Sequence, residues 1–206
     1  VIEPLLTGTN RDGGSIVSAT MRDNLAEITI PITIVQKTKT LSAPGSEGFI
    51  IFEYWLYNHN IENLTSIYFG FASDFDLGQG GDNAFYDPSY EMAWQQSENG
   101  KAVGIVGLMN VNGFSYVSNG AQKIGFNRQQ KFNAISTNVY SSIPGAASDI
   151  MSVTKSGPFN IAPGDSVKIA LTIVIGNGTT DLYQNALRAR ESYELATDID
   201  NGGEPN

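Results

Sequence analysis

The feature that most constrains this fold is the period-two alternation of apolar residues along several segments of the chain. In Ser166–Gly176, SVKIALTIVIG, one face carries the apolar side chains Val167, Ile169, Leu171, Ile173 and Ile175. Alternation of this kind is typical of a β-strand that packs one face on a core. Residues 49–57, FIIFEYWLY, are apolar on both faces except for Glu53, which predicts a strand at the centre of a sheet.

Further strands are predicted at residues 27–35, 64–73, 102–111 and 113–118. In the first of these, isoleucines alternate with polar residues. Pro31 lies within that segment and cannot donate to a ladder, so we expect an edge strand or a bulge there. In the second, Gly70 and Ala72 share a face with Tyr68, and these small residues should let another layer approach closely.

Two helices are also predicted. Asn127 can cap a short helix over RQQKFNAIS, which would bury Phe132 and Ile135. Thr179 or Thr180 can cap a longer helix over DLYQNALRARESYELA, which begins with an acidic residue at its favourable amino end. One apolar stripe of that helix should lie against a sheet, formed by Leu182, Ala186, Ala189 and Tyr193.

These elements predict a mainly β fold: an antiparallel β-sandwich with one short internal helix and one C-terminal helix. A length of 206 residues with 41% hydrophobic residues suits a single domain over residues 1–206. The polar ends, at about 1–14 and 197–206, resemble connectors. The Pro-Gly segments SAPGSEG, SSIPGAAS and NIAPGDS are predicted to be turns.

Charge and composition narrow the expected partners. The net charge of −9, from 12 basic and 21 acidic residues, disfavours nucleic acid and anionic lipid. No apolar run approaches the roughly 20 residues that span a membrane, so no membrane insertion is expected. The chain lacks cysteine, and such compositions are common among bacterial surface proteins. It begins at Val1, so we expect a processed or excised segment of a secreted, extracellular or cell-surface protein.

The segment from residue 70 to residue 90 gathers acidic residues and glycines. Asp74 and Asp76 lie two residues apart at the end of a predicted strand, so their side chains should emerge on one face. With Asp82, Asn83 and Asp87 they offer enough hard oxygens for calcium, which takes six to eight ligands. The alternative is a loop whose acids cap turns and face water. The spacing does not match an EF-hand.

Catalytic chemistry is limited by what the chain lacks. His59 is the only histidine and lies in a turn, so a Ser-His-Asp triad and a His-rich zinc site are not expected. Glu53, alone in an apolar strand, is the natural candidate for the acid of a glycosidase, because burial would raise its pKa. The alternative is that it pairs with a lysine or arginine on a neighbouring strand.

Aromatic residues suggest a second route to carbohydrate. Alternation predicts that Trp55 is buried, which leaves Trp94, Tyr86 and Tyr90 as an exposed loop set. Such rings can serve as platforms on which sugars stack. The competing interpretation is that they form the edge of the core.

Several segments together resemble a known group of modules: IYFGFASDFDLG, DNAFYD, KAVGIVGLM, FNRQQKFNAIST and SGPFNIAPGDSVKIALTIVIG with the helix after it. They are similar to modules found toward the carboxyl ends of large secreted bacterial proteins, some of which carry subtilisin-like protease domains. Phe75 stands where that group usually has Trp. The resemblance implies a non-catalytic extracellular β-sandwich in which Asp74 and Asp76 match an acidic pair, and it carries over no catalytic residue.

Two functions therefore compete at this stage. The first is a non-catalytic structural or accessory module, stabilised by a cation such as calcium, whose partners are other domains of the same protein or neighbouring copies in a filament or layer. The second is a carbohydrate-binding module or glycan-active protein that uses loop aromatics and carboxylates.

Overall fold

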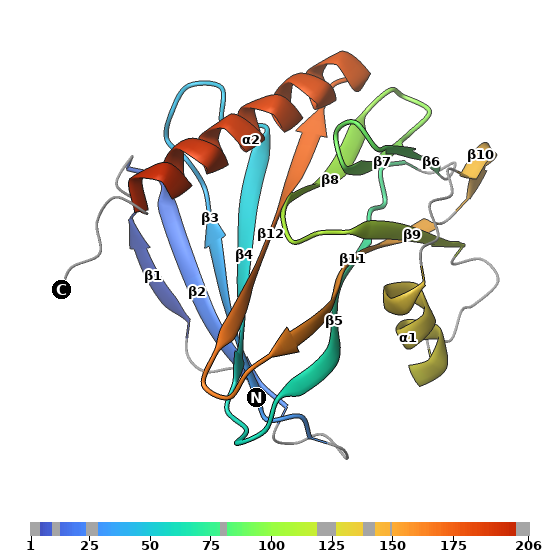
Figure 1. Cartoon of the computed structure of the whole chain (residues 1–206). Coiled ribbons are helices and arrows are strands. Elements are labelled where there is room, and N and C mark those ends of the chain that lie inside the picture. The colour runs from blue at the N-terminus through green and yellow to red at the C-terminus, as the bar shows by residue number, and fades with distance from the viewer. Residues whose placement is uncertain are drawn as a thin grey trace.

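The computed structural model describes residues 5–9, 13–23, 29–78, 82–118, 127–137, 143–148 and 150–200. Two antiparallel sheets and two helices make up this part of the chain (Figure 1). Within it, no helix combines the length and the apolar character needed to cross a bilayer. The sequence prediction of a mainly β sandwich with an internal and a C-terminal helix is confirmed.

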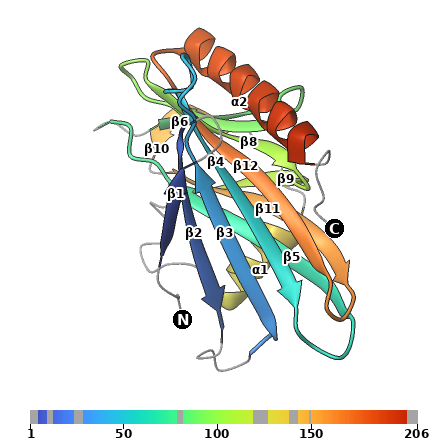
Figure 2. The same cartoon turned by 90° about the vertical axis from the view of Figure 1, so that its left-hand side faces the viewer.

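The main sheet has nine strands. Their spatial order is β1 (Leu6–Thr9), β2 (Ser15–Arg22), β3 (Ile32–Lys39), β4 (Phe49–Asn58), β12 (Ser166–Gly176), β8 (Ala102–Met109), β7 (Met92–Gln96), β6 (Asp82–Asp87) and β10 (Ile143–Ser148). The second sheet contains β5 (Leu64–Asp74), β11 (Ile150–Ile161) and β9 (Gly113–Ser118). The helices are α1 (Arg128–Ser136) and α2 (Thr179–Asp200). Figure 2 shows the long strands β2, β3 and β4 side by side.

The first core lies between the two sheets. Tyr54 of β4 packs on Phe69 of β5 with ring centroids 4.8 Å apart, and Phe52 lies 5.9 Å from Phe71. Alternate residues of β12 on the same face, such as Leu171, are fully buried. This confirms the predicted inward face for Val167, Ile169, Leu171 and Ile173, whereas Ile175 at the end of the strand is 53% exposed.

The second core lies on the other face of the main sheet, under α2. The four residues of the predicted helical stripe are buried, with Leu182, Ala186 and Ala189 at 0% exposure and Tyr193 at 5%. They pack with Phe49 and with other residues of the main sheet in one apolar cluster. The main sheet is therefore covered on both faces at its centre (Figure 1).

Helix α1 lies on the outer face of the second sheet. A Cβ atom at Gly70 would lie 2.4 Å from Cγ2 of Ile135, so only glycine allows the helix to approach this closely. Asn127 caps the helix in a reciprocal pair with Gln130, as predicted. Phe132, however, is 51% exposed, and the expectation that it would be buried is wrong. Its ring meets the edge of Tyr68 at the margin of the sheet instead.

Lys155 of β11 fixes the carboxyl end of α1. Its side chain is 2% exposed, and its ammonium donates a hydrogen bond to the carbonyl of Thr137 just beyond the helix. A cation is favourable at this end of a helix because the last carbonyls are unpaired. Burial lowers the pKa of Lys155 from its ordinary value.

Several predicted elements occur at the expected residues. β9 and β12 have the predicted bounds, β5 extends one residue further to Asp74, and β8 ends at Met109. β4 lies between β3 and β12, as expected for a central strand. The NIAPGDS turn joins β11 to β12, where Gly164 takes a positive φ of 74°.

Other expectations need correction. Pro31 does not make an edge strand, because β3 begins at Ile32, directly after it, and lies between β2 and β4. The first two residues of the predicted segment, 27 and 28, lie outside the described residues. Part of the predicted SSIPGAAS turn forms β10 instead. The sequence analysis also missed the strands β1, β2, β6, β7 and β11. β1 falls inside the predicted amino-terminal connector, and α2 runs to Asp200, inside the carboxyl-terminal one.

The helix stripe gives a direct test of the second core. Replacing Leu182 by Ala should lower the free energy of unfolding by about 2 to 4 kcal/mol, because it leaves a cavity under α2. Leu187→Ala on the same helix is the matched control. Leu187 is 45% exposed, so its loss should change stability by about 0.5 kcal/mol. Urea titration followed by circular dichroism measures both, and equal effects would contradict the packing of α2.

Candidate functional site

Glu53, the candidate catalytic acid, lies at the centre of the main sheet. It is 1% exposed, and its carboxylate oxygens lie 2.5 Å from Nζ of Lys39 on β3 and 2.6 Å from Nζ of Lys168 on β12. The side chains of Lys39 and Lys168 are 22% and 26% exposed, so the carboxylate is buried while both ammoniums keep contact with water. The alternative interpretation, a glutamate paired across neighbouring strands, is confirmed.

The main sheet separates Glu53 from the acidic loop. Glu53 shares a strand face with Phe49 and Ile51, which belong to the cluster under α2. The second sheet, whose strand β5 ends at Asp74, packs on the opposite face. Glu53 and Asp74 therefore cannot flank one sugar ring, which is the arrangement that a pair of glycosidase carboxylates requires.

The acidic pair itself faces outward. Asp74 and Asp76 are exposed, whereas Phe75 and Leu77 between and after them are half-buried and line a pocket. The two carboxylates thus alternate with the apolar side chains, as two residues spaced two apart along extended backbone should.

The remaining predicted calcium ligands lie along β6. Asp82 begins the strand and Asp87 ends it, so their Cα atoms are about 16 Å apart at the rise of extended backbone. Asn83 pairs with Gln96 in the ladder to β7. Asp87 accepts hydrogen bonds of 2.8 Å from the hydroxyl of Tyr183 and from the backbone nitrogen of Ser89.

The five predicted calcium ligands therefore lie in two segments, the end of β5 with the residues after it and the length of β6. Among the residues whose side chains are described, which do not include Asp82, no three acidic or histidine side chains are grouped to hold a metal. Calcium binding by Asp74 and Asp76 stays a prediction. His59, the lone histidine, is exposed beside Tyr57, in the turn where it was expected.

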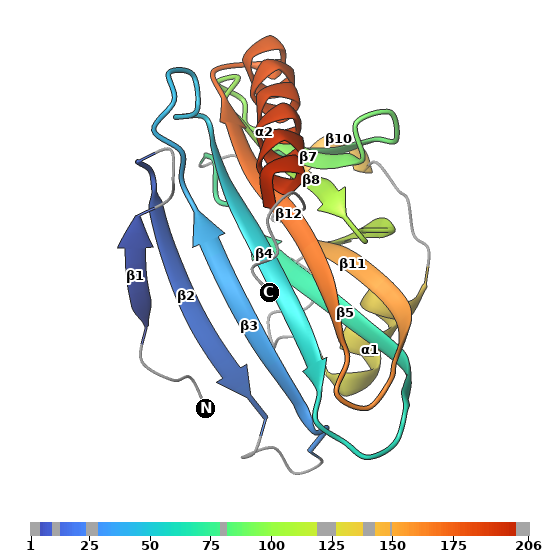
Figure 3. The same ribbon diagram turned by 60° about the vertical axis from the view of Figure 1, so that its left-hand side comes forward.

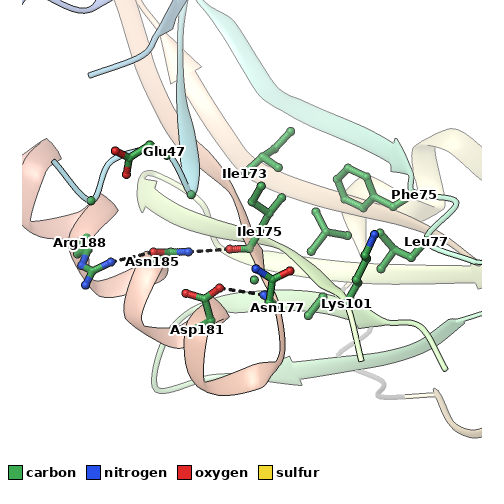
Figure 4. A pocket seen from close by; sticks show the side chains of 15 residues that line it. Glu47, Phe75, Leu77, Lys101, Ile173, Ile175, Asn177, Asp181, Asn185 and Arg188 are labelled. Carbon is green, nitrogen blue, oxygen red and sulfur yellow. Dashed lines mark hydrogen bonds between the residues drawn. The ribbon is translucent and has the colours of Figure 1, made fainter. Parts of the chain in front are cut away.

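A pocket of about 720 Å³ opens at the end of the sandwich nearest the start of α2 (Figure 4). Phe75 and Leu77 line one end, and Arg188 of α2 with Glu47 lines the other. Ile175 lines the wall between them and is 53% exposed, because β12 extends beyond the second sheet here.

The polar groups of this pocket largely hold one another. Asn185 donates 2.8 Å to the carbonyl of Ile175 and accepts 3.3 Å from Arg188, and Asp181 accepts 2.9 Å from the backbone nitrogen of Asn177. These contacts pin the first turns of α2 to the end of β12. The prediction that Thr179 or Thr180 caps the helix is wrong in detail, because α2 already starts at Thr179. The side chain of Asp181 instead accepts the hydrogen bond from the backbone nitrogen of Asn177, which precedes the helix.

The aromatic residues reverse the sequence prediction. Trp94 is 8% exposed and stacks on Phe85 at 4.2 Å, and Tyr90 packs edge-on against Tyr183 at 4.7 Å. Tyr86 packs on Phe114 in a tilted arrangement at 5.3 Å. Trp94 is thus buried, and the partly buried Tyr86 and Tyr90 pack at the edge of the core, as in the competing interpretation. Trp55, predicted to be buried, is only half-buried, because its face of β4 extends beyond α2.

The comparisons with known proteins reveal only remote likeness. No family model matches the chain, and no curated protein matches it. Similar solved structures are heparan sulfate lyase HepC from Pedobacter heparinus, a mutant of that enzyme, and a structure described as Heparinase III. Each is 8% identical with a TM-score of 0.46, over 83%, 84% and 86% of this chain. The chain spans about a fifth of their length, at 21% to 22%, and likeness at this level supports no conclusion about function.

The ion pairs of Glu53 with Lys39 and Lys168 should stabilise the folded chain. Glu53→Gln removes the charge that holds Lys39 and Lys168 together and should cost about 1 to 3 kcal/mol, less than a fully buried pair because the lysines can rehydrate. Glu98→Gln, at an exposed turn, removes the same charge and should change little. Thermal and urea unfolding measure both, and a Glu53→Gln protein as stable as the parent would contradict this role.

Buried tyrosines should make the fold sensitive to alkali. Burial raises the pKa of Tyr54 from 10.0 to about 12, so unfolding releases a proton between these values. Stability should therefore fall between pH 10 and pH 12, by about 1.4 kcal/mol per pH unit for this residue. Tyr54→Phe should flatten that slope in urea titrations at stepped pH. An unchanged slope would refute the assignment, and comparison with the parent cancels the opposing contribution of Lys155.

Proposed function

We propose that this chain is a non-catalytic structural or accessory module of a secreted or cell-surface bacterial protein. The observation that carries the proposal is the state of Glu53. The carboxylate best placed to act as a buried acid is held by two lysines in the main sheet and lies on the opposite side of that sheet from Asp74. This favours a role in cross-strand stabilisation over acid–base chemistry. The resemblance to non-catalytic modules of secreted proteins points the same way.

The edge of the main sheet suggests how such a module joins its neighbours. β1 is the outermost strand, all four of its residues are exposed, and β2 is its one partner strand in the described part of the chain. Leu5 and Leu6 are 61% and 71% exposed. An edge of this kind can accept a strand from another copy or domain, with backbone hydrogen bonds supplying affinity.

The acidic pair has a place in the same proposal. Asp74 and Asp76 lie at the end of β5, beside the loop that continues into β6. A calcium ion bound there would stabilise this corner of the sandwich, by binding to the folded chain only. The carbohydrate-active alternative loses support from the loop aromatics, because Trp94 is buried and Tyr86 and Tyr90 pack half-buried at the edge of the core.

Assembly through β1 is tested by charge placed on the edge. Leu6→Lys should lower concentration-dependent association, because a lysine on an edge strand opposes pairing with another chain. Leu187→Lys, at a 45% exposed position on α2, is the matched control and should leave association unchanged. Small-angle scattering and sedimentation over a concentration series measure the effect.

Two outcomes would contradict the proposed function. Cleavage of a glycan by the parent protein, lost in Glu53→Gln at a pH where both proteins stay folded, would show that the carboxylate is catalytic. A parent chain that stays monomeric at every concentration, alone and with the neighbouring domains of its host protein, would remove the assembly role.

A further inference from the structure

A cluster of lysines lies around Trp55 on the face of the main sheet that carries α2. Nζ of Lys37 is 4.8 Å from the centroid of the Trp55 ring, and Nζ of Lys168 is 4.9 Å from it. Lys39 lies two residues further along β3, on the same face of the strand, and its ammonium binds the carboxylate of Glu53. Lys37, Lys39, Trp55 and Lys168 are called the lysine–tryptophan surface below.

The strand register explains why these side chains meet. Trp55 pairs with Lys168 on β12, and Glu53 pairs with Lys37 on β3, so the lysines from both neighbouring strands converge on β4. Neighbouring strands lie about 4.8 Å apart, so side chains at paired or diagonal positions of β3, β4 and β12 can reach one another. α2 packs on β12, β8 and β4, and leaves β3 and β2 uncovered beside it (Figure 3).

The surface is positive in an acidic protein. The surface and Glu53 together carry three ammoniums and one carboxylate, a difference of two positive charges, in a chain whose net charge is −9. Glu53 binds Lys39 and Lys168, whereas Lys37 has no carboxylate within ion-pair distance among the described residues. The electron-rich ring face holds the ammoniums of Lys37 and Lys168 in place, so their position is fixed before any ligand arrives.

We propose that the lysine–tryptophan surface binds an acidic polysaccharide, a chain of sugars that carry carboxylates. The ammonium of Lys37, with those of Lys168 and Lys39 beside it, would pair with uronate carboxylates, and the exposed part of Trp55 would contact the apolar face of a sugar. This site goes beyond the structural role proposed above and does not depend on it.

The shape of the surface favours a polysaccharide over a peptide. β3, β4 and β12 are interior strands with both edges paired, so an extended peptide would find no backbone ladder to join. The face beside α2 is open over β3 and β2 (Figure 3), which suits a polymer recognised through its substituents. Nucleic acid is less suited, because a duplex carries about one negative charge per 1.7 Å of its axis, whereas a polyuronate carries one carboxylate per sugar and is repelled less by the acidic remainder of the protein.

The test compares two forms of one polymer on the full chain. Polygalacturonate should bind at low salt in affinity electrophoresis or calorimetry, and the binding should weaken as salt rises. The same polymer with its carboxylates methyl-esterified removes the charge and keeps the sugar, and it should not bind. Binding of both forms alike, or of neither, would overturn the proposal.

Variants at Lys37 locate the site. Lys37→Gln should weaken binding about three- to fivefold, the effect of one partly exposed ion pair, and Lys37→Glu should weaken it further. Both keep Glu53 with its two bound lysines, and melting curves check that the fold is intact. Lys131→Gln and Lys131→Glu on α1 change the same charge at an exposed site in another layer and should leave affinity within about twofold.

Three results would refute this site. Equal effects at Lys37 and Lys131 would show that binding follows net charge alone. Tighter binding of polyglutamate would identify an acidic peptide as the ligand class, and tighter binding of single-stranded DNA would identify a nucleic acid.

Discussion

Burial of β4 and β12 on both faces is the constraint on which the rest of this structure depends. One face of these strands packs on the second sheet through Tyr54 and Leu171, and the other packs under α2 through Phe49. A strand covered twice has no solvent face on which to place a charge. Glu53 is accommodated only because it lies where the cover of α2 ends, within reach of lysines from both neighbouring strands. The same boundary leaves Trp55 half-buried and creates the lysine–tryptophan surface.

The layered arrangement also separates the chemical groups of the chain. The acidic pair at Asp74 and Asp76 lies on the second-sheet side, and the Glu53 group lies on the helix side. Phe75 and Leu77 alternate with these two acids along the chain and line the pocket at the end of the sandwich. The apolar and the acidic side chains of this short segment therefore point in opposite directions.

The parts of the fold that were predictable are those whose pattern follows from one packing surface. β9, β12 and the stripe on α2 agree with the sequence prediction because their periodicity reports burial directly. The strands that were missed behave otherwise. β1 is exposed throughout, so it carries no alternation, and β6 lies inside an acidic, glycine-rich segment that resembles a loop.

The surroundings of Glu53 and Trp55 were less predictable, because they depend on how far α2 covers the main sheet. Alternation places Trp55 correctly on a packed face, yet it cannot reveal that α2 stops covering that face near Lys168. The sequence predicts a loop around Trp94 because β7 is short and lies between turns. The pairing of Glu53 with lysines was open in the sequence, since it requires the strand order β3-β4-β12, which no local pattern encodes.

The attachment of α1 has a consequence for local opening of the fold. None of its residues is fully buried. It is held by a few contacts: Ile135 against Gly70, Phe132 against Tyr68, and hydrogen bonds from Lys155 to the carbonyl of Thr137 and from Ser115 to that of Ala134. Helix α2, by contrast, has four side chains sealed in a core. The amide hydrogens of α1 should therefore exchange with solvent through local unfolding of this helix. Those of α2 should exchange only when the sandwich itself unfolds. Exchange of the two helices should thus report on two different free energies of opening.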